Sequence, residues 1–175
     1  MLNKAVRLHG VNDLRLDEFD LPAIRDDEIL VKVVSDSICM STYKAAIQGS
    51  GHKRVPDDIE RHPPIVGHEF CGVIEKVGAK WKGSYAEGDR FAIQPNIDYK
   101  GTIMTPSYAF EFCGGDTQYA VLPPEVMEQS CLLKHRAREF FYGSLSEPLS
   151  CIIGAFHAQY HTRKGDYRQI GRAHV

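Results

Sequence analysis

The sequence predicts a mainly β protein with a few helices, an α+β chain, and three observations support that fold class. Short runs rich in β-branched residues alternate apolar and polar side chains, as strands with one buried face do. Glycine, proline and aspartate separate these runs at positions suited to turns. A convincing helical pattern appears only near the end of the chain, from Leu145 onward.

The first half of the chain begins with strands and continues into one short helix. Strands are predicted over residues 4–8, 14–19 and 29–34, bounded by turn-forming Gly, Asp and Pro. A helix is predicted over residues 41–48, with Ser41 or Thr42 as its N-cap and the Gly49-Ser50-Gly51 break at its end. Residues 49–64 are predicted to form a polar loop.

The second half resumes with strands and ends in a longer helix. Strands are predicted over residues 65–77, 90–94 and 118–122. Residues 95–117 are rich in Gly, Pro and aromatic residues and show little periodicity. A helix is predicted over residues 145–161, where apolar residues recur at helical spacing: Leu149, Ile152, Ile153 and Phe156.

Composition limits the classes of partner. The 175 residues, 43% of them hydrophobic, suffice for one core and a piece of a second domain. A formal charge of -2 provides no broad basic field for nucleic acid or an anionic membrane, so the expected partner is a small molecule. No signal peptide or run of about 20 apolar residues is present, and we expect a soluble, cytoplasmic protein.

The five cysteines predict neither a disulfide framework nor an all-cysteine zinc site. Their number is odd, they are widely spaced, and no C-x-x-C pair occurs. Reduced thiols that pack as small buried hydrophobes are the simpler expectation for four of them: Cys71, Cys113, Cys131 and Cys151.

One set of residues predicts a catalytic metal site: Cys39, the His68-Glu69 pair and Glu147. Thiolate, imidazole and carboxylate are ligands that zinc accepts, and three protein ligands leave a position open for substrate. Each residue alone also has a simpler explanation. An isolated cysteine is more often a buried hydrophobe, and Glu147 could merely complement a helix dipole. In a straight strand Glu69 would point away from His68.

Longer motifs carry a family resemblance. The stretch GHEFCGVIEKVG followed by GDRF resembles the G-H-E-x-x-G signature of the medium-chain, zinc-containing alcohol and polyol dehydrogenases, and Cys39 precedes it at the family's distance. Gly114-Gly115 with QYAV, and EPLSC at residues 147–151, resemble two further family segments. Idiosyncratic stretches such as DSICMSTYKAAIQGSGHKRVPDD most resemble members that act on L-sorbose 1-phosphate.

The resemblance implies a domain organisation. It implies a GroES-like β-barrel catalytic domain over residues 1–150 and, over residues 151–169, the first helix of a Rossmann cofactor domain that this chain lacks. The chain ends before any G-x-G-x-x-G fingerprint, so we expect a truncated chain that does not turn over by itself. Residues 170–175 resemble the translation of a sequencing adapter, and we expect them to be a non-native tail.

The resemblance also implies a chemistry. The expected reaction interconverts a secondary alcohol of a sugar alcohol phosphate and its ketone, of the L-sorbose 1-phosphate or glucitol 6-phosphate type, with NAD or NADP. Cys39, His68 and Glu69 would be zinc ligands, with Glu147 at the metal or next to it. Ser41 matches the hydroxyl that passes the alcohol proton toward solvent. Residues 80–117 contain only one cysteine, Cys113, which is too few for a second, structural zinc site, so we predict a single catalytic zinc per chain. The resemblance also implies that the full-length enzyme is a homo-oligomer.

Substrate recognition is the least family-like part of the chain. Met40, Thr42 and Lys44 depart from the common C-G-S/T-D-x-H pattern. We hypothesise that Lys44, or the basic loop His52-Lys53-Arg54, contacts a substrate phosphate, and we take Lys53 as the candidate residue of that loop. A solvated loop is the alternative, and we favour it for Arg54. The other histidines are expected at the surface or in packing: His9, His52, His62, His135, His157, His161 and His174.

Two other functions remain open at this point. The enzyme could act on a free polyol, a simple alcohol or an amino alcohol such as threonine. Alternatively, the chain could be a zinc-free GroES-like module that only binds or assembles. Zinc content after dialysis distinguishes the module from an enzyme.

Overall fold

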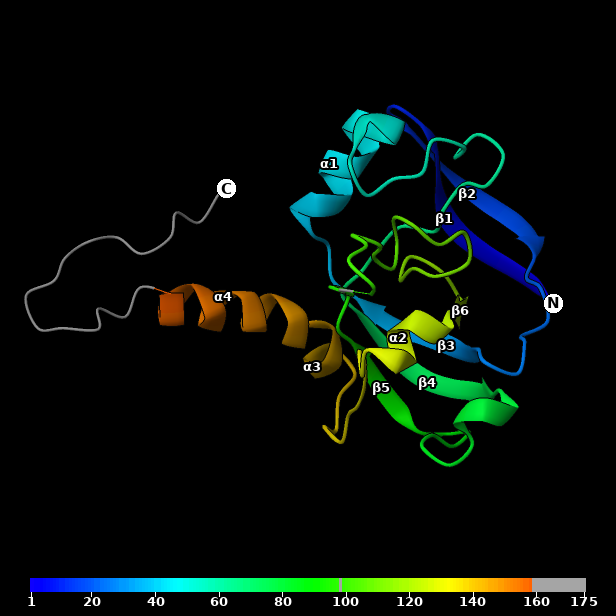
Figure 1. Cartoon of the computed structure of the whole chain (residues 1–175), viewed down its shortest axis with the longest axis vertical. Helices are drawn as coiled ribbons and strands as arrows, with labels where there is room; N and C mark the ends of the chain where they lie inside the picture. The colour runs from blue at the N-terminus through cyan, green and yellow to red at the C-terminus, as the bar shows by residue number, and fades with distance from the viewer. Residues whose placement is uncertain (98, 159–175) are drawn as a thin grey trace, which may run out of the picture.

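A computed structural model describes residues 1–97 and 99–158, and it confirms the mainly β fold class. The strands form a β-rich body, and one helix, α4 (Ser146–Ala158), projects away from it (Figure 1). The predicted end of this helix at residues 159–161, and the expected tail at residues 170–175, lie outside the described residues.

Two antiparallel sheets make up the body. Strands β1 (Leu2–Gly10) and β2 (Asp13–Asp20), both predicted as strands from the alternating pattern, pair as an antiparallel hairpin. The second sheet has five strands in the order β6-β3-β4-β5-β7. Its members are β3 (Ile29–Asp36), β4 (Phe70–Val77), β5 (Arg90–Ile93), β6 (Tyr119–Leu122) and β7 (Leu132–Lys134). Isolated bridges from Ala5 to Thr117 and from Arg7 to Ile65 join the hairpin to the rest of the body.

The remaining helices are short. Helix α1 (Met40–Gln48) continues into a 3-10 turn, Gly49–Gly51, and a second such turn spans Ala79–Trp81. Helices α2 (Pro124–Glu128) and α3 (Phe141–Ser144) complete the set. The sequence pattern missed α2, α3 and β7 because elements of five residues or fewer are too short to show a hydrophobic period.

Two apolar clusters form the core. The larger lies under the five-stranded sheet, where Phe70 meets Phe91 edge to face with ring centroids 5.9 Å apart. The smaller joins β1 and α1 to the segment that precedes the His68-Glu69 pair, and it includes Val55 and Ile59. The loop over residues 49–64 is therefore not wholly exposed, as a polar loop would be, because these two buried residues pack it against the core.

Two further expectations need correction. The strand predicted over residues 65–77 begins only at Phe70, because the backbone has a positive φ at Gly67 and bends at Glu69. Cys151 is exposed on α4 and is not a packing residue, whereas Cys71, Cys113 and Cys131 are buried as expected.

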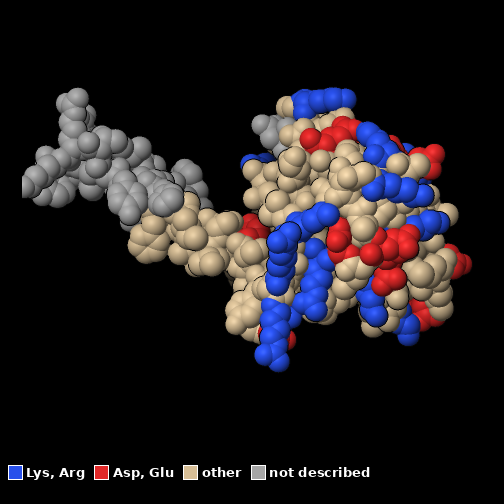
Figure 2. Space-filling view, turned by 90° about the horizontal axis from the view of Figure 1, so that it is seen from below, with Lys and Arg blue, Asp and Glu red and all other residues tan. Residues whose placement is uncertain are grey.

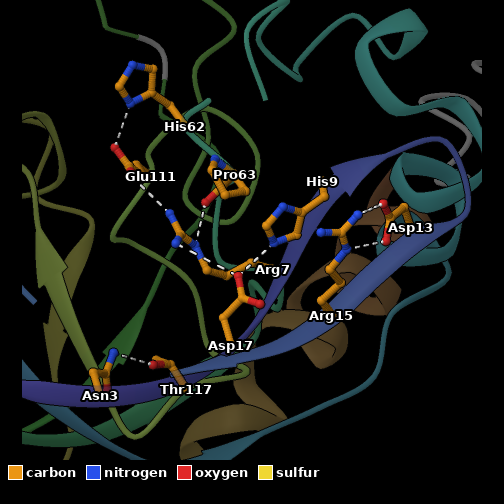
Figure 3. Close-up of polar contacts among 10 residues, drawn as sticks. All are labelled: Asn3, Arg7, His9, Asp13, Arg15, Asp17, His62, Pro63, Glu111 and Thr117. Atoms are coloured by element: carbon orange, nitrogen blue, oxygen red, sulfur yellow. Dashed lines mark hydrogen bonds and ion pairs between the residues drawn. The ribbon is translucent and has the colours of Figure 1, made fainter. Parts of the chain in front are cut away.

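A buried arginine ties the hairpin to the loop that leads into His68. The Nε of Arg7 donates to the Pro63 carbonyl at 2.8 Å, and its Nη2 donates to Glu111 Oε1 at 2.8 Å (Figure 3). The other oxygen of Glu111 lies 3.1 Å from His62 Nδ1. Because charge-assisted bonds hold this loop at both His62 and Pro63, the segment entering the His68-Glu69 pair has a fixed position.

The surface shows no large region of a single charge on the face drawn in Figure 2, where acidic and basic side chains intermingle over the β-rich body. The projecting helix is drawn almost entirely as uncharged residues in the same view. No helix in the described part of the chain is long and apolar enough to cross a membrane.

Candidate metal centre

Cys39 lies between β3 and α1 and acts as the N-cap of the helix. Its Sγ accepts a hydrogen bond from the Ser41 backbone N–H at 3.5 Å and lies 3.4 Å from Ser41 Oγ. The prediction that Ser41 or Thr42 caps the helix is wrong, because the sulfur already occupies that role. The Ser41 N–H at the helix N-terminus therefore helps to hold the Cys39 sulfur in position.

The backbone bend places Glu69 beside His68. Gly67 has φ of 87°, and a Cβ there would lie 2.0 Å from Asp36 Oδ2 and 2.7 Å from the Asp116 nitrogen. Only glycine adopts this conformation in so little space. Because residues 67–69 are not in a strand, the alternation that would separate the His68 and Glu69 side chains does not apply.

Three potential ligand atoms converge from these two segments. One atom each from Cys39, His68 and Glu69 lies within 4.8 Å of the others, and His68 and Glu69 are only 7% and 5% exposed. Zinc–sulfur and zinc–nitrogen bond lengths in a tetrahedral site imply ligand separations of about 3.5 Å. Small side-chain adjustments would therefore bring the atoms to bonding distance. The donor set of sulfur, nitrogen and oxygen fits zinc.

A tyrosine orients the imidazole. The hydroxyl of Tyr108 lies 3.1 Å from His68 Nδ1, and the tyrosine ring packs between the rings of His68 and His52 at centroid distances of 5.5 and 5.6 Å. The other ring nitrogen, Nε2, lies 3.9 Å from Glu69 Oε1. With Nδ1 engaged by the hydroxyl, Nε2 is the nitrogen left beside Glu69 to coordinate a metal, and a partner on the other ring nitrogen is usual for metal-binding histidines.

Burial favours the neutral forms of both rings. It lowers the pKa of His68, although the Glu69 carboxylate acts in the opposite direction, and the Arg54 charge lowers it further. Burial also raises the pKa of Tyr108 to about 12, while hydrogen bonds with Ser41 and Thr42 partly oppose that shift. A neutral imidazole beside a neutral phenol is the state that can coordinate a metal.

The two glutamates have different positions. Glu69 accepts a short hydrogen bond from the Ser37 hydroxyl, and its backbone N–H donates to Asp36 Oδ1 at 3.1 Å. Glu147, in the first turn of α4, is not part of the group of three. Its pKa is raised, chiefly by burial and also by the charge of Glu69 nearby. The geometry therefore favours Glu69 as the direct ligand and Glu147 as an adjacent carboxylate.

A cavity of about 690 Å³ opens beside these groups. Of the predicted site residues, four line it: Ser41, Lys53, His68 and Glu147. Cys39 and Glu69 are not among the lining residues, and neither is Lys44, which is exposed on α1. The sequence missed several lining residues, because neither motif nor spacing distinguishes them: Gln94, Asn96, Thr105 and Tyr108. His52 and Arg54, the other two residues of the basic loop hypothesised to contact phosphate, also line it, whereas the sequence favours a solvated position for Arg54 and a surface or packing role for His52.

The sequence matches known proteins over most of its length. Residues 25–132 match the family described as the alcohol dehydrogenase GroES-like domain. The chain is 50% identical to an L-sorbose 1-phosphate reductase of Klebsiella pneumoniae over 95% of this chain and 40% of the relative. It is 45% identical to a mannitol-1-phosphate 5-dehydrogenase of Aliivibrio fischeri, over 90% of this chain and 37% of the relative. The chain thus spans about two fifths of these relatives.

Solved structures share the fold. A 2R,3R-butanediol dehydrogenase of Bacillus subtilis superposes with a TM-score of 0.72 at 24% identity, covering 89% of this chain and 47% of that one. Galactitol-1-phosphate dehydrogenase of Escherichia coli superposes with a TM-score of 0.69 at 22% identity, covering 89% of this chain and 44% of that one. Together with the family match, these similarities confirm the GroES-like architecture.

Proposed function

This chain belongs to the alcohol dehydrogenase GroES-like domain family, and from that premise we propose that it is the catalytic domain of a zinc-dependent oxidoreductase. The proposed reaction interconverts a secondary alcohol of a sugar alcohol phosphate and its ketone, with NAD or NADP as the hydride carrier. The convergence of Cys39, His68 and Glu69 is the observation that carries the proposal, because a module that only binds or assembles has no need of it.

The proposed domain organisation follows from the same family. Residues 1–150 form the catalytic domain, and α4 leads toward a Rossmann cofactor domain in the full-length enzyme. Four apolar side chains of α4 support this, since each is at least 47% exposed: Leu149, Ile152, Ile153 and Phe156. We further propose a cytoplasmic homo-oligomer whose oligomer contacts lie outside this chain.

Each site residue has a proposed task. Zinc bound by Cys39, His68 and Glu69 would supply a Lewis acid that favours an alkoxide over an alcohol. Tyr108 keeps the His68 ring oriented, and the helix-capping position keeps the Cys39 sulfur fixed. These contacts limit the reorganisation needed when substrate binds.

Proton movement is assigned to Ser41 and Glu147. The Ser41 hydroxyl lines the cavity and can both accept and donate a proton, so it can carry the alcohol proton toward solvent. Glu147 lines the same cavity, where burial raises its pKa above the usual range of a carboxyl, and we assign it the exchange of protons with the cavity. Lys53, at the cavity wall, is a proposed contact for the substrate phosphate.

The test is substrate-dependent reduction of NAD and NADP by the full-length enzyme, combined with its zinc content after dialysis. We expect one zinc per chain and faster turnover of a hexitol phosphate than of hexitols, simple alcohols or threonine. A protein that retains no zinc would refute the enzyme and favour a binding module. A zinc enzyme that prefers a free alcohol would refute the proposed substrate class alone.

A further inference from the structure

Arg54 is an unusual arginine in the described part of the chain. Its guanidinium is half-buried and forms no ion pair with any described carboxylate. The two other described arginines that are not fully exposed have strong partners. Arg7 is paired with Glu111, and Arg90 donates to two backbone carbonyls at 3.0 and 2.8 Å. A half-buried cation without a counter-ion is costly, and it persists most readily where a bound anion completes the site.

The guanidinium is nevertheless held in place. Its Nη1 donates to Thr105 Oγ1 at 2.5 Å, and Thr105 is only 2% exposed. The backbone N–H of Arg54 donates to His52 Nδ1 at 3.3 Å, and the His52 ring stacks on Tyr108. The neutral Thr105 hydroxyl thus fixes one nitrogen of the forked guanidinium and leaves the positive charge of Arg54 uncompensated. The remaining N–H donors are left for another partner.

The cavity supplies further donors beside this fork. Lys53 lines the same cavity as Arg54, and so do Gln94 and Asn96. The Gln94 Oε1 accepts from the Asn96 backbone N–H at 3.0 Å, which leaves the Gln94 NH₂ group as a donor. Glu147 and Cys151 line the cavity too, together with His68, so the cationic groups share this cavity with one of the three candidate metal ligands.

We propose that Arg54 binds the phosphate monoester of the substrate, positioned by Thr105 and assisted by Lys53. This inference rests on the proposed function and deepens it, because it identifies the group that distinguishes a phosphorylated polyol from a free one. A guanidinium binds phosphate oxygens through two parallel hydrogen bonds, a geometry that the ammonium of lysine cannot reproduce. The expectation that Arg54 is a solvated surface residue is replaced by this role.

The kinetic test uses the full-length zinc-loaded enzyme with a polyol phosphate and its parent polyol. Losing a charge-assisted hydrogen bond should lower kcat/KM of Arg54→Gln for the phosphate ester by about 10- to 100-fold, with a smaller loss for the parent polyol. Arg54→Lys should recover only part of the loss, and Thr105→Val should lose less than Arg54→Gln. Arg138→Gln, at a side chain that is 94% exposed, is the matched control and should behave as wild type.

The cofactor also carries phosphate, and the same variants distinguish the two sources. A rise in KM for the sugar phosphate alone supports the inference, whereas a rise in KM for NAD or NADP alone overturns it. Equal losses on the phosphate ester and the parent polyol also overturn it. Zinc content and melting temperature of each variant must match wild type, so that a folding defect is not mistaken for lost recognition.

A second measurement keeps this inference separate from the proposed reaction. Inorganic phosphate titrated into the zinc-loaded protein, followed by calorimetry, should bind wild type at least about 10-fold more tightly than Arg54→Gln. If wild type oxidises neither alcohol, the proposed function fails, and this titration still decides the role of Arg54. If wild type and Arg54→Gln bind phosphate equally, the role of Arg54 fails while the zinc dehydrogenase remains.

Discussion

Replacing Tyr108 with phenylalanine should weaken zinc binding without removing a ligand. The substitution keeps the ring that packs against His52 and His68 and deletes only the hydroxyl 3.1 Å from His68 Nδ1. His68 is 7% exposed, so little water can replace the lost partner. A buried donor without a partner costs about 1–3 kcal/mol. That cost falls on the tautomer whose Nε2 coordinates the metal, which predicts a loss of about 5- to 150-fold in zinc affinity.

The assay is competition for zinc against a chromophoric chelator, repeated with Co²⁺ so that its absorption reports the ligand geometry. Tyr142→Phe, at a side chain that is 56% exposed, is the control and should bind both metals as wild type does. An unchanged zinc affinity for Tyr108→Phe, with an unchanged cobalt spectrum, would show that the hydroxyl does not support the imidazole. A melting temperature that falls while metal affinity holds would indicate a packing role only.

Three further predictions test the centre and its surroundings. Cys39→Ser should reduce bound zinc from one per chain to a small fraction, because a hydroxyl is a poor zinc ligand; atomic absorption after dialysis would contradict this by finding full occupancy. Gly67→Ala should lower stability by about 2 kcal/mol or more, since the new Cβ meets Asp36 and the backbone keeps a positive φ; urea unfolding with an unchanged midpoint would rule this out. Burial, followed by the charge of Asp116, raises the pKa of Asp36 to about 8, so the folded metal-free protein holds a proton that the unfolded chain releases above pH 4. Its stability should therefore fall from about pH 4 to about pH 8, and Asp36→Asn should flatten that slope in thermal unfolding; an identical slope in wild type and variant would contradict the assignment.

Much of the fold could be predicted because its longer elements carry a clear period. The strands β1, β2 and β3 appear within two residues of their predicted bounds, and α1 begins one residue before its predicted start. The start of β4 could not be placed from the pattern. Apolar residues occur both before the bend at Gly67, at Ile65 and Val66, and after it, so the sequence does not show that the strand begins only after the bend. That bend depends on a tertiary contact, the approach of Gly67 to Asp36 and Asp116, which the local sequence does not record.

The residues of the candidate site also fall into those that the sequence could predict and those that it could not. Cys39, His68 and Glu69 were predictable because a motif ties their residue types to a spacing, and their convergence within 4.8 Å is confirmed. Tyr108 and Thr105 were not predictable, because they lie in a segment without periodicity and reach the site only through folding. Arg54 is less exposed than the solvated loop position favoured for it, for a physical reason. A charged residue in a polar loop is usually solvated. Here Val55 packs in the smaller core cluster, and the adjacent Arg54 guanidinium donates a hydrogen bond to Thr105.

The charges around the cavity indicate that the proposed phosphate recognition would need a group distinct from the candidate metal centre. A Zn²⁺ ion held by one thiolate and one carboxylate has no net charge left to attract a dianion. Glu147, which also lines the cavity, adds repulsion whenever it is ionised. Under the proposed function, a substrate phosphate would need its counter-charge elsewhere in the same cavity, where Arg54 and Lys53 are cationic lining residues.

If the alcohol carbon and the phosphate of such a substrate bind at separate positions, the distance between them would select which carbon is oxidised. Moving the cation, for instance by pairing Arg54→Gln with Asn96→Arg, should then shift the preference between positional isomers of the phosphate ester. Unchanged isomer preference in a variant that still binds phosphate would show that Arg54 supplies affinity without setting the position of attack.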